Sequence, residues 1–285
     1  MRRASSLAVV VPSILVLAAC RGDREGTSET ITWKGPIKAG ATFAYLSRDG
    51  SLTVEEGSAD SAELVVKVRR RSDAVGSGRL TVLQDGDGLI ACIIFKDGQP
   101  CTREGYAAAD WNARGIDASA TLTLPRGHKV DVQTSNGSVK VLAPTAEARV
   151  STSNGSVTVT DVAGLASVST SNGSVRVKNV RGAIDVSTSN GSVRLTLDTI
   201  AGPITAASSN GSITAYLPTS ASAKLAMSTS NGTATLDLPG NVTSKTPNAI
   251  EAMLGGGAFP VTLTSSNARV RVLPNRGESG DDDDH

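Results

Sequence analysis

The chain is dominated by short runs in which apolar and polar residues alternate, broken at regular intervals by Ser-Asn-Gly. Successive Asn-Gly pairs between residues 136 and 231 are 18, 18, 18, 20 and 21 residues apart. An apolar residue such as Val168 stands four positions before each Asn, and apolar residues such as Val175 and Val177 stand three and five positions after it. Alternation with period two is typical of half-buried β-strands, so each repeat predicts two strands.

The chain must turn between these two strands. The apolar positions on either side of Asn are seven residues apart, and one straight strand would place them on opposite faces. We therefore expect a corner at Asn-Gly, where Gly supplies a positive φ and Asn tolerates the bend. A second corner is expected near Gly164, Gly182 and Gly202. Each repeat thus consists of a strand, an Asn-Gly corner, a strand and a Gly corner.

Two arrangements fit such repeats: a meander of antiparallel hairpins, which also uses Asn-Gly turns, and a stack of coils. Stacking favours the same residue at the same offset in every copy, because identical side chains then lie above one another and share hydrogen bonds. We therefore predict an all-β fold, a β-solenoid with turns of about 18–21 residues. A ladder of asparagines should fill the inner corner, as a structural element rather than a binding site. The ladder consists of Asn136, Asn154, Asn172, Asn190, Asn210, Asn231 and Asn267, with a degenerate copy at Asp49.

The repeat resembles a known family. Its form is Val-x-Val-x-Thr-Ser-Asn-Gly-Ser-Val-x-Val, preceded by Leu-Thr-Leu-Pro-Arg-Gly at 122–127, and it is similar to the bacterial "putative adhesin" family, a domain of unknown function. The resemblance covers about residues 40 to 274, except for 68–111, and includes the Gly-rich segment at 254–257. It implies a β-solenoid module of envelope and exported proteins, and it brings no known catalytic residues.

The N-terminus has the pattern of a bacterial export signal. Two arginines precede an apolar run from Leu7 to Leu17, and two alanines precede Cys20. Leu-Ala-Ala-Cys also looks like a lipobox, in which Cys20 becomes the lipidated first residue of the mature chain. An ordinary cleaved signal is the alternative. Lipidation would place the protein in the bacterial cell envelope, exported and anchored to a membrane, at the outer membrane and periplasm or at the cell surface.

The chain is accordingly divided into four parts. Residues 1–19 form a lipoprotein signal peptide, and residues 20–30 are the lipidated Cys and a flexible tether. Residues 31–274 form the solenoid domain, in which 70–111 is an irregular strand excursion. Residues 275–285 form a disordered acidic tail. Further strands are expected at 64–68, 80–83 and 89–95, and a loop is expected at 245–257.

Export permits disulfides. An apolar run and an Asp-Gly turn signal separate Cys92 from Cys101, so we predict a disulfide across a hairpin that caps the first coil. A metal or redox pair is disfavoured because the Cys-x-x-Cys spacing is absent and neither His is nearby in sequence. No metal or cofactor is indicated elsewhere.

Few residues are suited to catalysis. His128 is expected in a surface turn, and no Gly-x-Ser-x-Gly supports a Ser-His-Asp site. The aspartates at 131, 161, 185 and 198 occupy different repeat offsets and predict no acidic pair. We therefore expect a non-catalytic protein. The alternative is a carbohydrate-active enzyme, a polysaccharide lyase or hydrolase on a β-solenoid, with its site where the repeat is interrupted, at 70–111 or 245–257.

Charge and composition narrow the partners. Lys+Arg 28 against Asp+Glu 27 gives a net charge of +1, and no nucleic-acid motif accompanies Arg69-Arg70-Arg71, so we expect no nucleic-acid partner. Only 3% of residues are aromatic, which suits thin β layers.

The outward positions of the repeat define two surfaces. Positions one and three residues before Asn are mostly Ser, forming a flat neutral face for which ice or crystal-lattice binding is an outside alternative. Four residues after Asn, stacking would align cations about 4.8 Å apart. This candidate binding stripe consists of Lys140, Arg176, Arg194 and Arg271. It fits adhesion to an anionic envelope polymer or a surface protein, or a scaffolding role. The alternative is a solvated face that discourages aggregation.

Overall fold

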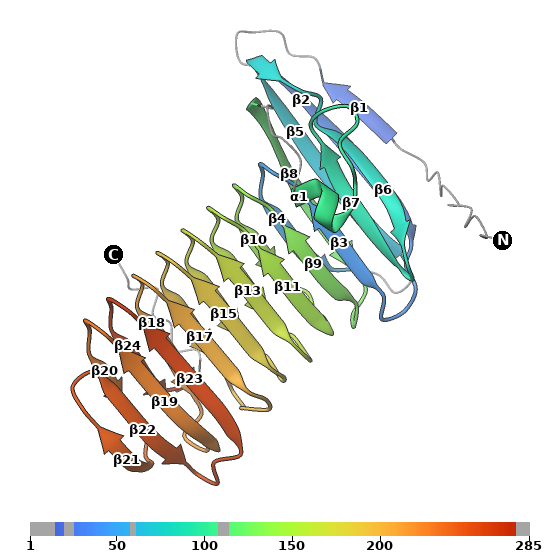
Figure 1. Ribbon diagram of the computed structural model, residues 1–285. Coiled ribbons are helices and arrows are strands. Elements are labelled where there is room, and N and C mark those ends of the chain that lie inside the picture. The colour runs from blue at the N-terminus through green and yellow to red at the C-terminus, as the bar shows by residue number, and fades with distance from the viewer. Residues whose placement is uncertain (1–14, 20–25, 58–60, 108–113, 278–285) are drawn as a thin grey trace, which may run out of the picture. The chain divides into compact units, whose positions relative to one another are not determined.

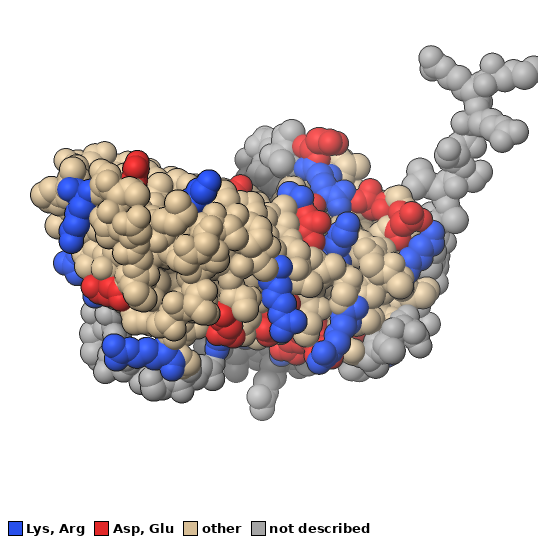
Figure 2. All heavy atoms as spheres, turned by 90° about the horizontal axis from the view of Figure 1, so that it is seen from below, with Lys and Arg blue, Asp and Glu red and all other residues tan. Residues whose placement is uncertain are grey.

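The computed structural model describes residues 15–19, 26–57, 61–107 and 114–277 (Figure 1). The chain forms two compact units, residues 1–158 (unit 1) and 159–285 (unit 2). Within the described ranges, α1 (Arg103–Ala107) is the only helix, and β-strands make up most of both units. On the face shown in Figure 2, cationic and acidic side chains of the described residues lie near one another over part of the surface, beside a broad neutral area.

Unit 2 shows the repeat in its plainest form. One coil consists of β15 (Ile184–Thr188), the corner at Asn190 and Gly191, β16 (Val193–Thr196) and a second corner. Alternate side chains of both strands are buried. Strands of successive coils pair in parallel and in register, so that Val186 of β15 lies between Val168 and Ala206. This arrangement is a β-solenoid and excludes the antiparallel meander.

The coils of unit 2 do not stack in chain order (Figure 1). One sheet contains, in spatial order, β13 (Ala166–Thr170), β15, β17 (Ile204–Ser208), β23 (Phe259–Ser265), β19 (Ala223–Thr229), β22 (Ala249–Leu254) and β21 (Asn241–Lys245). The other contains β14 (Val175–Lys178), β16, β18 (Ile213–Leu217), β24 (Val270–Pro274) and β20 (Ala234–Leu236). The last coil, β23–β24, is therefore inserted between the two coils that precede it in sequence.

The loop predicted at 245–257 is wrong in part. β22 pairs antiparallel with β19, and β21 pairs antiparallel with β22, so a hairpin extends the sheet beyond the end coil. β22 buries Ile250, Ala252 and Leu254 on one face. This alternation is visible in the sequence but falls outside the Asn-Gly period, which is why the repeat did not reveal it.

Unit 1 also contains an inserted coil. β3 (Thr42–Leu46) and β4 (Leu52–Glu56) form the first coil in the chain. They pair in parallel with β9 (Lys129–Gln133) and β10 (Val139–Val141) on one side, and with β7 (Gly88–Ile94) and β8 (Arg114–Leu124) on the other. β11 (Glu147–Ser151) follows β9, and β12 (Val157–Thr160) runs across the boundary between the units. The first coil thus lies between the second and the third.

Antiparallel strands extend the two sheets of unit 1 beyond the coil formed by β7 and β8. β5 (Ser61–Val75) pairs with β8, β2 (Thr27–Pro36) pairs with β5, and β6 (Arg79–Asp85) pairs with β7. The strands expected at 64–68, 80–83 and 89–95 are present, but β5 continues seven residues past Val68. β2 begins inside the stretch expected to be a tether. β1 (Leu15–Ala19), within the expected signal, pairs with β2, so cleavage before Cys20 would leave β2 at the edge.

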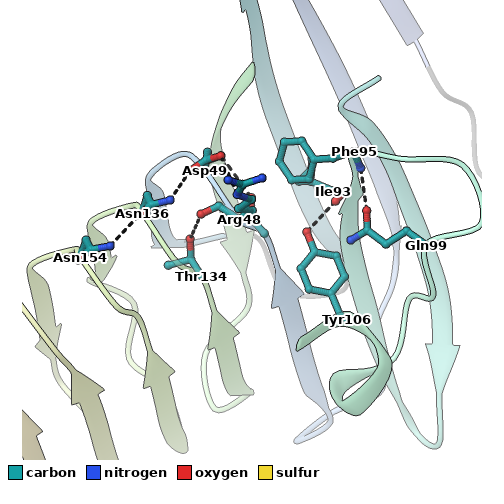
Figure 3. Close-up of polar contacts among 10 residues, drawn as sticks. Arg48, Asp49, Ile93, Phe95, Gln99, Tyr106, Thr134, Asn136 and Asn154 are labelled. Carbon is teal, nitrogen blue, oxygen red and sulfur yellow. Dashed lines mark hydrogen bonds and ion pairs between the residues drawn. The ribbon is translucent and has the colours of Figure 1, made fainter. Parts of the chain in front are cut away.

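The predicted disulfide is present between Cys92 and Cys101, with their Cα atoms 5.7 Å apart. The bond joins β7 to the segment leading into α1 rather than to a second strand. The hydroxyl of Tyr106 in α1 donates a hydrogen bond to the carbonyl oxygen of Ile93 over 2.7 Å (Figure 3). Burial raises the pKa of Tyr106, so this hydroxyl keeps its proton. Cys101 and Tyr106 pack in one buried cluster with side chains of β3 and β7, and Leu83 of β6 packs against it, so the segment from Cys101 through α1 covers these strands.

Candidate functional site

The Asn-Gly corners of unit 2 are joined on their outside by a ladder of side-chain hydrogen bonds. Asn190 Nδ2 donates to Asn172 Oδ1, and Asn210 Nδ2 donates to Asn190 Oδ1, both over 2.7 Å. Asn267 then donates to Asn210, and Asn231 donates to Asn267, so the ladder follows the spatial order of the coils. All five side chains are exposed. Our expectation that they fill the inner corner is therefore wrong, because the strand and its alternation end two residues before Asn.

A shorter ladder runs along unit 1 (Figure 3). Asn154 Nδ2 donates to Asn136 Oδ1 over 2.7 Å, and Asn136 Nδ2 donates to Asp49 Oδ1 over 2.6 Å. A carboxylate accepts hydrogen bonds and does not donate them, so Asp49 suits the end of the ladder. The guanidinium of Arg48 lies 3.4 Å from the other carboxylate oxygen of Asp49.

The inner corner is occupied instead by Thr or Ser, two residues before each Asn. Thr188 Oγ1 donates to the carbonyl oxygen of Gly173 on the neighbouring coil over 3.2 Å and accepts the N–H of Gly191 on its own coil over 3.2 Å. Ser208 makes the equivalent pair of bonds at the next corner. These hydroxyls are buried. The sequence shows the Thr column, but its role in joining coils depends on the geometry of the corner.

Glycine follows every Asn of the ladder except Asn267, where Ala268 stands, and at Gly191 and Gly211 the glycine is favoured by lack of space and not, as we expected, by a positive φ. Gly191 and Gly211 are not among the residues with positive φ. A Cβ on Gly191 would lie 1.8 Å from the carbonyl oxygen of Gly173, and one on Gly211 would lie 1.8 Å from that of Gly191. The absence of a side chain therefore lets successive corners stack in direct contact.

The candidate stripe falls on both units. Lys140 lies on β10 in unit 1, and the three arginines lie on one sheet of unit 2. Arg176 on β14 is in register with Arg194 on β16, which is in register with Thr214 on β18. Thr214 is in turn in register with Arg271 on β24. The inserted last coil therefore places Arg271 inside the sheet, two strands from Arg194.

A second row of outward side chains lies two residues further along the same strands. In it Tyr216 of β18 is in register with Leu273 of β24, and Lys178 of β14 with Thr196 of β16. The guanidinium carbon of Arg194 lies 5.7 Å from the centre of the Tyr216 ring, a distance at which cation–π attraction holds the two together. The term cationic face denotes both rows: Arg176, Arg194, Thr214, Arg271, Thr235, Lys178, Thr196, Tyr216 and Leu273.

The cationic face carries an excess of positive charge in its two rows, and the exposed Asp237, directly after β20, ends the second row beside Leu273. The side chains of Arg176 and Arg271 make no hydrogen bond or ion pair with any other residue that the structure describes. The aspartates that follow β12 and β16 lie at the second corner, where Asp161 accepts from Asn179 over 3.3 Å and Asp198 accepts from Asn275 over 2.9 Å. The face therefore has the charge and the exposure to receive an anion.

His128, which we expected in a surface turn, is 4% exposed. Its Nδ1 lies 3.0 Å from the carbonyl oxygen of Pro125, and its Nε2 lies 3.2 Å from that of Lys38. Both ring nitrogens thus face backbone acceptors and connect two segments of unit 1. Neither nitrogen faces a Ser hydroxyl.

The two segments that the sequence offered for an enzyme site contain regular secondary structure. Segment 70–111 contains the end of β5, β6, β7 and α1, and segment 245–257 contains β22. Across the described ranges, no group of three or more His, Cys, Asp and Glu residues could hold a metal ion. The same part of the chain contains no helix long and apolar enough to cross a membrane. Cys20, the candidate lipidation site, lies outside the described residues.

The in-register coils and their two corners define a β-solenoid protein. A family model described as Toastrack DUF4097 matches residues 130–272, just over half of the chain. The chain therefore belongs to the Toastrack DUF4097 family, and the resemblance seen in the repeat is confirmed.

Two solved structures are similar to this chain. One is a "putative cell adhesion protein" from Clostridium sporogenes, with 10% identity and a TM-score of 0.37, covering 85% of this chain and 98% of that one. The other is a "putative adhesin" from Bacteroides fragilis, with 12% identity and a TM-score of 0.36, covering 86% of this chain and 97% of that one. The comparison with curated proteins finds no match.

Proposed function

We propose that this chain is a non-catalytic protein of the bacterial cell envelope, anchored by a lipid on Cys20, whose solenoid serves as an adhesive or scaffolding surface for an anionic envelope polymer. The observation that supports the binding role is the cationic face, where three arginines lie in one in-register row and Lys178 lies in the row beside it, with one acidic residue, Asp237, at the end of the second row. The anchor rests on the export signal and the Cys that ends it.

A polymer suits this surface better than a small anion. A single exposed ion pair contributes only about 0–1 kcal/mol, so one charge on the ligand would bind weakly. A chain with repeated carboxylates or phosphates can meet several cations at once, and each contact after the first is intramolecular. The parallel strands fix the spacing of the cations before binding, which lowers the entropy lost on association. Arginine is well suited because its planar guanidinium pairs with carboxylate or phosphate through two hydrogen bonds.

The test is retention of the chain from Arg21 on immobilised peptidoglycan, lipopolysaccharide or teichoic polymer, and capsule. The variant R176S/R194S/R271S removes three charges from the cationic face. The matched control R181S/K224S/K245S removes three exposed charges of unit 2 that lie outside the cationic face. We expect the parent and the control to be retained in a saturable, salt-sensitive manner, and the cationic-face variant not to be retained. Equal retention of all three proteins, or retention of none, would contradict the proposal.

A further inference from the structure

A second basic region lies at one end of unit 1, where β2 begins, β5 ends and β8 begins. Thr27 is in register with Arg70, and Arg70 with Ile116. Ser77 N–H donates to the carbonyl oxygen of Phe95 over 2.9 Å, which brings the end of β7 to the same place. The term basic tip denotes residues 26–30, 69–79, 95–97 and 114–116.

The basic tip has an excess of positive charge. Its cations are Arg69, Arg70, Arg71, Arg79, Lys96 and Arg114, and its acidic residues are Glu29, Asp73 and Asp97, with the exposed Asp117 at its border in register with Arg69. Arg70 is bound to Glu29 over 2.9 Å, and Arg71 is paired with Asp73 over 3.3 Å.

The remaining arginines of the tip are available. Arg69, Arg79 and Arg114 are exposed and have no ion pair within the ranges that the structure describes. Val75, in register with Arg114, is an exposed apolar side chain beside them, at 48%.

The opposite end of the same strands has the opposite balance. It consists of residues 34–38, 55–57, 61–63, 85–88 and 124–126, which meet through the pairing of Pro36 with Ser61 and of Glu56 with Leu124. Its acidic residues are Glu55, Glu56, Glu63, Asp85 and Asp87, and its cations are Lys34, Lys38 and Arg126. An anionic surface would therefore attract the basic tip and repel the other end of unit 1.

Sequence places the proposed anchor close to the basic tip. Thr27, the first residue of β2, follows Cys20 by seven residues. Seven residues span at most about 25 Å when fully extended. A lipid on Cys20 would therefore hold the tip within reach of the bilayer surface.

We infer that the basic tip of unit 1 docks on the anionic phospholipid surface in which Cys20 is anchored, with Arg69, Arg79 and Arg114 facing the headgroups and Val75 at the interface. This inference rests on the lipid anchor of the proposed function. Each basic side chain near such a surface strengthens binding about fivefold, so the three arginines together favour the docked state about 100-fold. Docking fixes which end of unit 1 faces the membrane.

The test uses the lipidated chain reconstituted in vesicles of phosphatidylcholine with phosphatidylglycerol, and in vesicles of phosphatidylcholine alone. Amide hydrogen exchange is followed over residues 69–79 and 114–116. We expect slower exchange of these amides in the anionic vesicles, and loss of that protection in R69S/R79S/R114S. The control R181S/K224S/K245S, which removes three exposed charges of unit 2 outside the cationic face, should keep the protection.

Two further measurements distinguish a failure of the docking from a failure of the lipid anchor. The slower amide exchange of the lipidated chain without substitutions should disappear as the salt concentration is raised, which tests the electrostatic contact without any mutation. The mass of the N-terminal peptide shows whether Cys20 is lipidated. An unlipidated Cys20 would refute the anchor and with it this inference. A lipidated chain whose tip exchanges equally fast in both vesicles would refute the docking alone.

Discussion

Replacing Gly191 by alanine tests whether close stacking of coils is what requires glycine at the Asn-Gly corner. A Cβ there would lie 1.8 Å from the carbonyl oxygen of Gly173, 2.4 Å from its carbonyl carbon and 2.9 Å from the nitrogen of Ser174. These are all backbone atoms, so no side-chain rotation relieves the overlap and the two coils must separate locally. Separation also weakens the hydrogen bond from Thr188 Oγ1 to Gly173, which spans the same corner.

The expected loss of stability follows from three contributions. Inserting a methyl group into a close-packed site costs about 1–3 kcal/mol. Weakening the hydroxyl and amide bonds at the corner adds about 1–2 kcal/mol. Alanine restricts the unfolded chain and returns about 0.4–1 kcal/mol. These contributions sum to about 1–5 kcal/mol, so we expect Gly191→Ala to lower the free energy of unfolding by about 3 kcal/mol.

The assay is chemical denaturation followed by circular dichroism, with Gly86→Ala as the control. Gly86 has a φ of +61° and no heavy atom within 4 Å of the position a Cβ would take. Alanine at Gly86 meets only the left-handed backbone penalty, about 1–2 kcal/mol, part of which the restricted unfolded chain offsets. If Gly191→Ala costs no more than Gly86→Ala, the stacking explanation is wrong.

Three further predictions concern the corners and one exposed ion pair. Asn190→Ala removes two ladder bonds of 2.7 Å at an exposed corner, so we expect a loss of about 1–2 kcal/mol in the same denaturation assay and unchanged polymer binding. Thr188→Val leaves buried backbone groups without their hydroxyl partner, and should cost about 2–3 kcal/mol. The hydrogen bond from Arg126 lowers the pKa of Glu56, so stability from this pair is present above the ordinary carboxylate pKa and is lost as pH falls through the lowered value. Arg126→Gln should raise the pKa of Glu56 back toward its ordinary range, which NMR titration of Glu56 would measure.

The coil itself was predictable because its determinants are local. Alternation around each Asn gives two strands, and the odd spacing of the apolar positions requires a corner between them. The same residues recur at the corner of successive repeats, and this recurrence predicts that the coils stack. The prediction that Asn occupies the inner corner was wrong. Asn190 and Thr188 are two residues apart and would point to the same side of a continuous strand. Only Thr188 points inward, because the strand ends at that residue.

The order of the coils was not predictable from the repeat. The coils of unit 2 share buried apolar side chains on their inner face and an Asn at the corner, which is followed by Gly except in β23–β24, where Ala268 follows Asn267. Nothing in the repeat of β23–β24 specifies a neighbour. The hairpin formed by β21 and β22 separates that coil from β19–β20 in sequence, which gives the chain the length to return and insert between earlier coils. Insertion depends on long-range pairing, which a local pattern does not encode.

This inserted order changes the electrostatics of the cationic face. If the coils followed the chain, Arg271 would stand three strands from Arg194, about 14 Å away along the sheet. In the structure Thr214 alone separates them, so the two positions are two strands, or about 10 Å, apart. Both spacings exceed the Debye length of about 8 Å at physiological ionic strength, so the two charges act on each other only weakly, but the shorter spacing lets a shorter stretch of a polyanion contact both. The insertion of the last coil thus joins Arg271 to the other cations as one binding surface.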